Sequence, residues 1–263
     1  MTAATDISMT RSTLARHAAI ALLATIGGLW ASAGVGGEIT TRERHRDATL
    51  MAIAPPPGIG FDIAVPDDRA AIARLGAALD ALYEASPYSA AAIAKLARHG
   101  EVVIVFDPAH PPQVVSNFTG VVLATFDANL FGDADDVSTR RFPVIVGRYL
   151  IKRSRQELAA VLAHELVGHG MQFLEGRMGE MDEADRECEA NLYKEQAFQD
   201  FGADKRSTAM VSFRQQLEWR WCAAFKRYMA AEMPGKMALW RRLNPDVPGL
   251  LEIFDDYLAA RGG

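Results

Sequence analysis

The chain has 263 residues, of which 49% are hydrophobic, so it can bury a substantial core and is not a disordered tail. Its 28 basic and 33 acidic side chains leave a formal net charge of −5. Because the sequence has no basic stripe interleaved with aromatic residues, nucleic acid is not an expected partner. One folded domain behind a leader is the simplest interpretation.

The N-terminus has the pattern of a secretory signal peptide. Arg11 and Arg16 precede an apolar run over residues 18–30, which ends in Ala31-Ser32-Ala33. We therefore predict a signal peptide over residues 1–33, cleavage after Ala33, and a mature protein in the periplasm or outside the cell. An uncleaved anchor is the alternative, although the run is shorter than the roughly 20 residues of a spanning helix. No membrane span is expected after cleavage.

Residues 34–66 are interpreted as a linker, because a run of charged residues is followed by the breaker Pro55-Pro56-Pro57-Gly58. A helix is expected to begin at Asp67 or Asp68, and a second one to run from Ser86-Pro87 to about Gly100. Short β-branched and apolar runs predict three strands, at 101–107, 121–126 and 142–146. The acidic segment 127–136 does not reproduce the EF-hand ligand series and is interpreted as a hairpin loop.

A third helix carries the most informative segment of the chain. Ser154 and Glu157 form a capping box at its start, and its apolar positions suit packing onto a sheet. The helix continues into Ala163-His164-Glu165-Leu166-Val167-Gly168-His169-Gly170. Histidines five residues apart would diverge by roughly 140° on an α-helix. A π turn would absorb the extra residue and align them, and Gly168 gives the backbone latitude for it.

Catalytic zinc typically has three protein ligands and a fourth position for water, and two histidines with a glutamate form one such set. Glu187 lies eighteen residues after His169 in an acidic, helix-compatible segment, and it is our candidate third ligand; Glu189 is the main rival. Asn191 shares a face with Glu187 and could orient it by hydrogen bonding. Glu165, next to a ligand, is the candidate general base.

These residues resemble a known family. His164-Glu165-Leu166-Val167-Gly168-His169 looks like the HExxGH signature of the dipeptidyl-peptidase III family of zinc peptidases, and Glu187-Cys188-x-Ala190 resembles its second signature. The resemblance implies His164, His169 and Glu187 as zinc ligands and Glu165 as the base. It covers about thirty residues. Asn191 stands where the family has an acidic residue, Glu189 where it has a basic one, and the chain is far shorter, so a shared gluzincin core is inferred and not membership.

The order of helix after sheet predicts an α+β, zincin-like domain over residues 67–263. In this domain a small, mainly antiparallel or mixed sheet packs on the zinc-binding helix. A helical C-terminal half follows, with helices at 207–233, 237–243 and 250–260. Val144–Arg148 is the candidate edge strand for an extended substrate, and an internal strand is the alternative.

The leading hypothesis is an exported zinc-dependent peptidase that binds Zn²⁺ and acts on a peptide or protein. The alternative is a non-catalytic exported scaffold or binding module whose metal site is structural or vestigial. Candidate oxyanion donors are Tyr193, His110, Arg148 and Arg220, and none of them stands out.

Cys188 and Cys222 are the only cysteines. In an exported protein they can form one disulfide, although the sequence does not show whether they meet. Cys188 is interpreted as a small buried residue, and a thiolate ligand or nucleophile at this position is the alternative.

Overall fold

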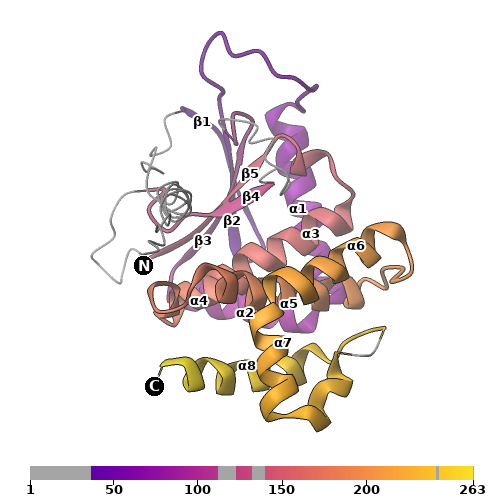
Figure 1. The fold of residues 1–263 in the computed structure, drawn as a ribbon. Helices are drawn as coiled ribbons and strands as arrows, with labels where there is room; N and C mark the ends of the chain where they lie inside the picture. The colour runs from indigo at the N-terminus through magenta and orange to yellow at the C-terminus, as the bar shows by residue number, and fades with distance from the viewer. Residues whose placement is uncertain (1–36, 112–122, 132–139, 241–242, 263) are drawn as a thin grey trace, which may run out of the picture. The chain divides into compact units, whose positions relative to one another are not determined.

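One mixed sheet of five strands forms the N-terminal half of the fold (Figure 1). The computed structural model describes residues 37–111, 123–131, 140–240 and 243–262, all of them within one unit that spans Gly34–Gly263. The strand order is β1-β2-β3-β5-β4; the inner pairs β2/β3 and β3/β5 are parallel, and the outer pairs β1/β2 and β4/β5 are antiparallel. The strands are β1 (Ile39–His45), β2 (Ala48–Ile53), β3 (Glu101–Asp107), β4 (Ala124–Phe126) and β5 (Arg141–Gly147).

The β1–β2 hairpin corrects one prediction. It occupies residues 39–53, which were interpreted as part of a linker. All six residues of β2 are buried, and the strand pairs with β3 in parallel, with Leu50 opposite Ile104. Because β2 is buried on both faces, its sequence does not alternate between apolar and polar residues. β1 is a mostly exposed edge strand rich in charged residues. Neither sequence therefore gave a clear strand signal. The predicted signal peptide, residues 1–33, lies outside the residues that the structure describes.

The local signals for the first two helices are confirmed. Helix α1 (Asp68–Ala85) begins after Asp67, whose side chain accepts a hydrogen bond from the backbone of Ala70. Helix α2 (Pro87–His99) is capped by Ser86, with proline in its first turn. Strands β3 and β5 also lie where predicted, and β4 covers residues 124–126 of the predicted run 121–126, whose first two residues lie outside the described part of the chain.

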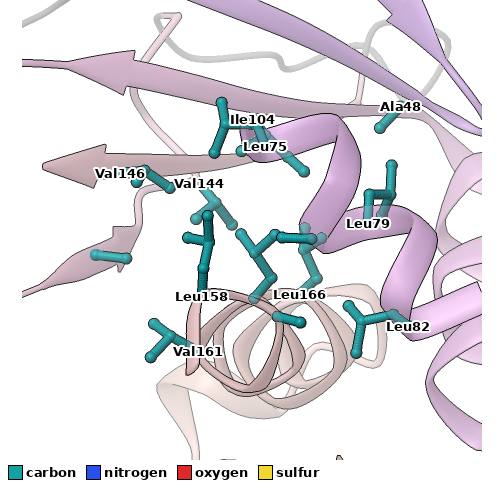
Figure 2. Packing of buried hydrophobic residues seen from close by; sticks show 14 of the residues in the cluster. Ala48, Leu75, Leu79, Leu82, Ile104, Val144, Val146, Leu158, Val161 and Leu166 are labelled. Carbon is teal, nitrogen blue, oxygen red and sulfur yellow. The ribbon is translucent and has the colours of Figure 1, made fainter. Parts of the chain in front are cut away.

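The third helix has three parts: α3 (Arg155–Leu162), the π-helical η3 (Ala163–Gly170) and α4 (Met171–Leu174). The predicted capping box of Ser154 and Glu157 is present. Figure 2 shows α3 and η3 packed against the sheet beside α1, and each large aliphatic side chain buried here contributes about 1.5–3 kcal/mol. The contact is made by Leu158, Val161 and Leu166 of this helix, Leu75, Leu79 and Leu82 of α1, and Ile104, Val144 and Val146 of the sheet.

Beyond this core the chain is helical and has a second core of its own. Phe225 and Phe254 are fully buried there, and they pack edge to face with their ring centroids 4.9 Å apart. A π-helical stretch interrupts the single helix that was predicted over residues 207–233. The elements are α5 (Glu183–Asp200), α6 (Thr208–Gln216), the π-helical η5 (Leu217–Trp221), α7 (Ala223–Glu232) and α8 (Val247–Gly262), with short 3₁₀ turns η2 (Leu150–Lys152), η4 (Arg177–Gly179) and η6 (Pro234–Leu239).

The fold is therefore α+β, as predicted, with a mixed sheet followed by a helical C-terminal half. The predicted edge strand is wrong, because β5 lies between β3 and β4. A short strand, β4, takes the edge position among the described strands. None of the helices in the described part of the chain is long and apolar enough to cross a membrane.

Candidate metal centre

The π-helical turn brings the two histidines of the motif together. All eight residues of η3 are buried, and the i to i+5 geometry predicted from the sequence is present. The rings of His164 and His169 lie with their centroids 4.8 Å apart and their planes at 88°. Each residue is 9% exposed, so both imidazoles are shielded from bulk water.

Glu187 lies across from both rings, in the first turns of α5. Its Oε2 is 3.5 Å from Nε2 of His164, and its Oε1 is 3.4 Å from Nε2 of His169. Ligand atoms of His164, Glu165 and His169 also lie within 4.8 Å of one another, so two carboxylates adjoin the histidine pair. Glu187 is the better match to a third ligand, because it turns one oxygen to each ring.

Glu165 is held by the sheet instead. Its Oε2 accepts a hydrogen bond of 2.8 Å from the backbone N–H of Phe126 in β4. Glu165 is 6% exposed, and this burial raises the pKa of its carboxyl group above the usual range. A carboxylate fixed by one oxygen, with raised basicity, is suited to accept a proton beside a metal.

The tautomer of His169 follows from its neighbour Gln172. The Nε2 amide of Gln172 donates to the backbone oxygen of Arg186 at 3.0 Å and to Oε2 of Glu189 at 2.9 Å. Its Oε1 is therefore the acceptor 2.9 Å from Nδ1 of His169, which places a proton on that nitrogen. In the neutral ring this leaves the lone pair on Nε2, the atom that faces Glu187.

Glu189, the rival ligand in the sequence, points away from the histidines. Both of its oxygens accept hydrogen bonds of 2.8 Å from Arg177, and it is 2% exposed. The bidentate arginine compensates its buried charge. Glu189 thus supports Gln172, and through it His169, from behind. Gln172 and Arg177 were not identified from the sequence. Gln172 could have been, because residues three positions apart on a helix are neighbours and it follows His169 by three.

Asn191 supports Glu187 as predicted. Its amide nitrogen donates to the backbone oxygen of Glu187 at 2.8 Å and approaches the carboxylate Oε2 at 3.4 Å. The bond to the backbone is the stronger of the two, so Asn191 acts mainly on the helical turn that carries Glu187.

Gly168 has a second role that the sequence did not suggest. A Cβ at this position would lie 2.5 Å from Cβ and 2.6 Å from Cα of Ala190. Glycine therefore allows η3 and α5 to approach closely, and this approach sets the distance between the histidines and Glu187.

The three candidate ligands titrate as a coupled group. Burial and the charge of His169 lower the pKa of His164 to about 3. Burial also opposes the charge of His169, but the hydrogen bond to Glu187 and nearby carboxylates outweigh it and raise that pKa to about 9. The same two histidines outweigh the effect of burial on Glu187 and lower its pKa to about 2.

The donor set fits a divalent metal. His164 Nδ1 is buried without a hydrogen-bond partner in the described part of the chain, whereas Nε2 faces the shared carboxylate. Two imidazoles and a carboxylate, with a second carboxylate beside them, are the nitrogen and oxygen ligands that Zn²⁺ accepts. The site could therefore hold a metal ion.

Lys194 is a further charged group near this centre. It lies on α5 seven residues after Glu187, so both share a face of the helix, and its charge lowers the pKa of Glu165 and of Glu187. Burial lowers the pKa of its own ammonium. Spacing alone could have identified it.

Most other candidates have structural roles. The Arg148 guanidinium donates to the backbone oxygens of residues 108–111 and pairs with Asp62. Tyr193 stacks on Tyr88, and Arg220 is exposed. Cys188 forms a disulfide with Cys222 and is fully buried, which agrees with its interpretation as a buried residue and leaves no thiol there.

Comparisons with protein-family models, with curated proteins and with solved structures give no match to this chain. The resemblance to the dipeptidyl-peptidase III signatures therefore rests on the motif residues alone.

Proposed function

We propose that this protein is an exported zinc-dependent peptidase in which His164, His169 and Glu187 hold Zn²⁺ and Glu165 is the general base. The observation that carries the proposal is the convergence of two buried imidazole Nε2 atoms on the two oxygens of Glu187, with the buried Glu165 beside them. Three such ligands leave a coordination position for water, as in catalytic zinc sites.

Zinc bound by these residues would lower the pKa of a water molecule and polarise a substrate carbonyl. Glu165 accepts the proton of the attacking water and later delivers it to the leaving amine. The N–H of Phe126 holds one oxygen of Glu165 during both transfers. Lys194 adds positive charge on the α5 side of the centre, which favours the ionised form of Glu165.

The edge strand β4 supports a peptide as the substrate. The Phe126 N–H that reaches Glu165 points away from β5, so the side of β4 that pairs with no other described strand borders the centre. Glu165 occupies this one N–H, so a substrate would pair with the other backbone groups of that side. An extended peptide can add to such an edge through backbone hydrogen bonds. This position replaces β5 as the proposed site of substrate pairing.

Export is supported by two features. The N-terminal segment 1–33 has the signal-peptide pattern, and the disulfide between Cys188 and Cys222 is typical of oxidising compartments.

Metal analysis of the chain without residues 1–33 tests the proposal. We expect one zinc per chain in the unmodified protein and in Glu165→Gln, and none in His164→Ala or Glu187→Ala. Glu183→Ala, an exposed carboxylate in the same helix, is the matched control and should keep its zinc. Hydrolysis of unfolded protein substrates should be lost in Glu165→Gln despite full zinc loading. Absence of zinc after supplementation, or unchanged turnover in Glu165→Gln, would contradict the proposal.

A further inference from the structure

Lys194 is a cation beside the metal centre that forms no ion pair within the described part of the chain. It lies in α5, and its Nζ is 5.4 Å from the centroid of the Phe213 ring in α6. None of the described carboxylates is hydrogen-bonded to this ammonium; those near it act only through their charge. A cation–π contact contributes about 0.5–1 kcal/mol but does not neutralise the cation. The ammonium can therefore still pair with an anion.

Zinc leaves the charge of Lys194 uncompensated. The three carboxylates that act on it are those of Glu165, Glu187 and Glu157. Glu157 is exposed, and its Oε2 already accepts hydrogen bonds from the backbone N–H of Ser154 at 3.1 Å and from its hydroxyl at 2.8 Å. Because zinc binds neutral histidines, the two charges of Zn²⁺ would balance Glu165 and Glu187. The ammonium is then the charge left over, and a cation partly withdrawn from water is costly without an anion.

This side of the centre is accessible to a ligand. The side chain of Glu187 is 33% exposed, compared with 11% for each of the two histidines. Lys194 is also partly exposed, and its Nζ, unlike Nδ1 of His164, is not a fully buried atom. Glu187, Asn191 and Lys194 follow one another at spacings of four and three residues, so they lie along one face of α5. A ligand at the metal can therefore extend along this face to Lys194.

The length of this face matches a short stretch of peptide. Seven residues separate Lys194 from Glu187, which is a rise of about 10 Å along the helix. Long side chains on a helix lean toward its N-terminus, which for Lys194 is the direction of Glu187. An extended peptide spans at most about 3.3–3.6 Å per residue. A group within about three residues of the scissile bond therefore lies within reach of the ammonium.

We propose that Lys194 binds a carboxylate of the peptide substrate within about three residues of the scissile bond. The carboxylate is that of the C-terminus or that of an acidic side chain, since both offer the same chemistry. It does not react; it compensates the ammonium and holds the peptide along α5. The inference rests on the proposed function, because the charge is left over only when the centre holds zinc.

Calorimetric titration of the zinc-loaded Glu165→Gln chain without residues 1–33 tests the inference, because this variant should bind peptides without cleaving them. The reference ligand is an N-acetylated, C-terminally amidated hexapeptide of neutral residues. The second ligand is the same peptide with a free C-terminus. The remaining ligands are amidated peptides in which glutamate replaces each residue in turn.

We expect at least one carboxylate peptide to bind at least about tenfold more tightly than the reference, the effect of one charged hydrogen bond. Tighter binding of the free C-terminus would identify the terminal carboxylate, and tighter binding of a glutamate peptide would identify a side chain. Equal binding of all the peptides, or no binding at about 1 mM, would overturn the inference. Zinc content and hydrolysis by the unmodified protein report separately on the proposed function, so the two can fail independently.

A pair of variants assigns the preference to Lys194. Lys194→Met keeps the length of the side chain and removes its charge, so carboxylate and reference peptides should bind alike. Lys236→Met, at an exposed lysine of η6, is the matched control and should keep the full preference. A preference retained in a folded, zinc-loaded Lys194→Met protein would mean that the carboxylate binds the metal directly, and would overturn the assignment. Thermal unfolding reports folding, and Lys194→Gln replaces the methionine variant if that one does not fold.

Discussion

At the scale of single residues, the two histidines of the centre are held in different ways. His169 is at the end of a hydrogen-bonded chain through Gln172 and Glu189 to Arg177. Among the residues that the structure describes, His164 has no comparable partner on its Nδ1. Outer-shell partners fix the orientation and tautomer of a ligand, so His169 is the better preorganised of the two.

Gln172→Ala should weaken zinc binding about 10- to 100-fold, because His169 loses the acceptor that fixes its tautomer. Competition with a chromophoric chelator measures the affinity. Gln216→Ala, an exposed glutamine, is the control and should have no effect. An unchanged affinity in a folded Gln172→Ala protein would mean that this chain of hydrogen bonds does not act on the metal.

Zinc affinity should also depend on pH in a defined direction. Without metal, the pKa of His169 is raised to about 9, so its ring carries a proton at neutral pH, whereas the pKa of His164, lowered to about 3, leaves that ring neutral. Zinc needs the lone pair of His169 and must displace that proton. Affinity should therefore rise about tenfold per pH unit between about pH 6 and 8 and level off above about pH 9.

Calorimetry in buffers of different ionisation enthalpy gives the number of protons released. We expect about one per zinc near pH 7. Binding with no proton release, or affinity independent of pH over this window, would show that His169 is neutral in the metal-free protein.

At the scale of elements, the contact of η3 with α5 sets the geometry of the centre. η3 carries both histidines and Glu165, α5 carries Glu187, and the two elements approach closely where Gly168 faces Ala190. The motif is thus completed by packing between η3 and α5, two helices that residues 171–182 separate along the chain.

Gly168→Ala should separate these helices, because the new Cβ would meet backbone and Cβ atoms of Ala190 within 2.6 Å. We expect a loss of about 1–3 kcal/mol in the free energy of unfolding and a lower zinc content, since Glu187 moves away from the rings. Urea unfolding and metal analysis measure the two effects. Gly179→Ala is the control, because nothing lies within 4 Å of a Cβ there. Equal stability of the two variants would refute the role of close packing.

Elements with local signals were predictable from the sequence, and those defined by distant partners were not. The caps at Asp67, Ser86 and Ser154 and the need for a π turn between the histidines are local properties. The strand β2 is buried by distant partners, and the edge position of β4 depends on strand order. The Arg177–Glu189–Gln172 contacts likewise need the folded arrangement of three segments.

At the scale of the whole molecule, α5 joins the two cores. Tyr193 and Ala197 of this helix pack in the core beneath the sheet, whereas Cys188 and Leu192 pack among the C-terminal helices. Cys188 is also adjacent to Glu187, so the disulfide links the turn that carries a proposed ligand to residue 222. The sequence supplied both cysteines, but only the fold shows that they meet.

Replacing both cysteines with alanine should lower the free energy of unfolding by about 2–4 kcal/mol. The disulfide spans 34 residues, and removing it restores entropy to the unfolded chain. Since α5 remains packed in both cores, the folded variant should still bind one zinc. Urea unfolding measures the loss of stability, and metal analysis measures the zinc content. Thiol titration of the unmodified protein, denatured without a reducing agent, should find no free thiol. An unchanged unfolding midpoint would show that the crosslink does not constrain the unfolded chain, and loss of zinc from the folded variant would show that the disulfide itself holds Glu187 in place.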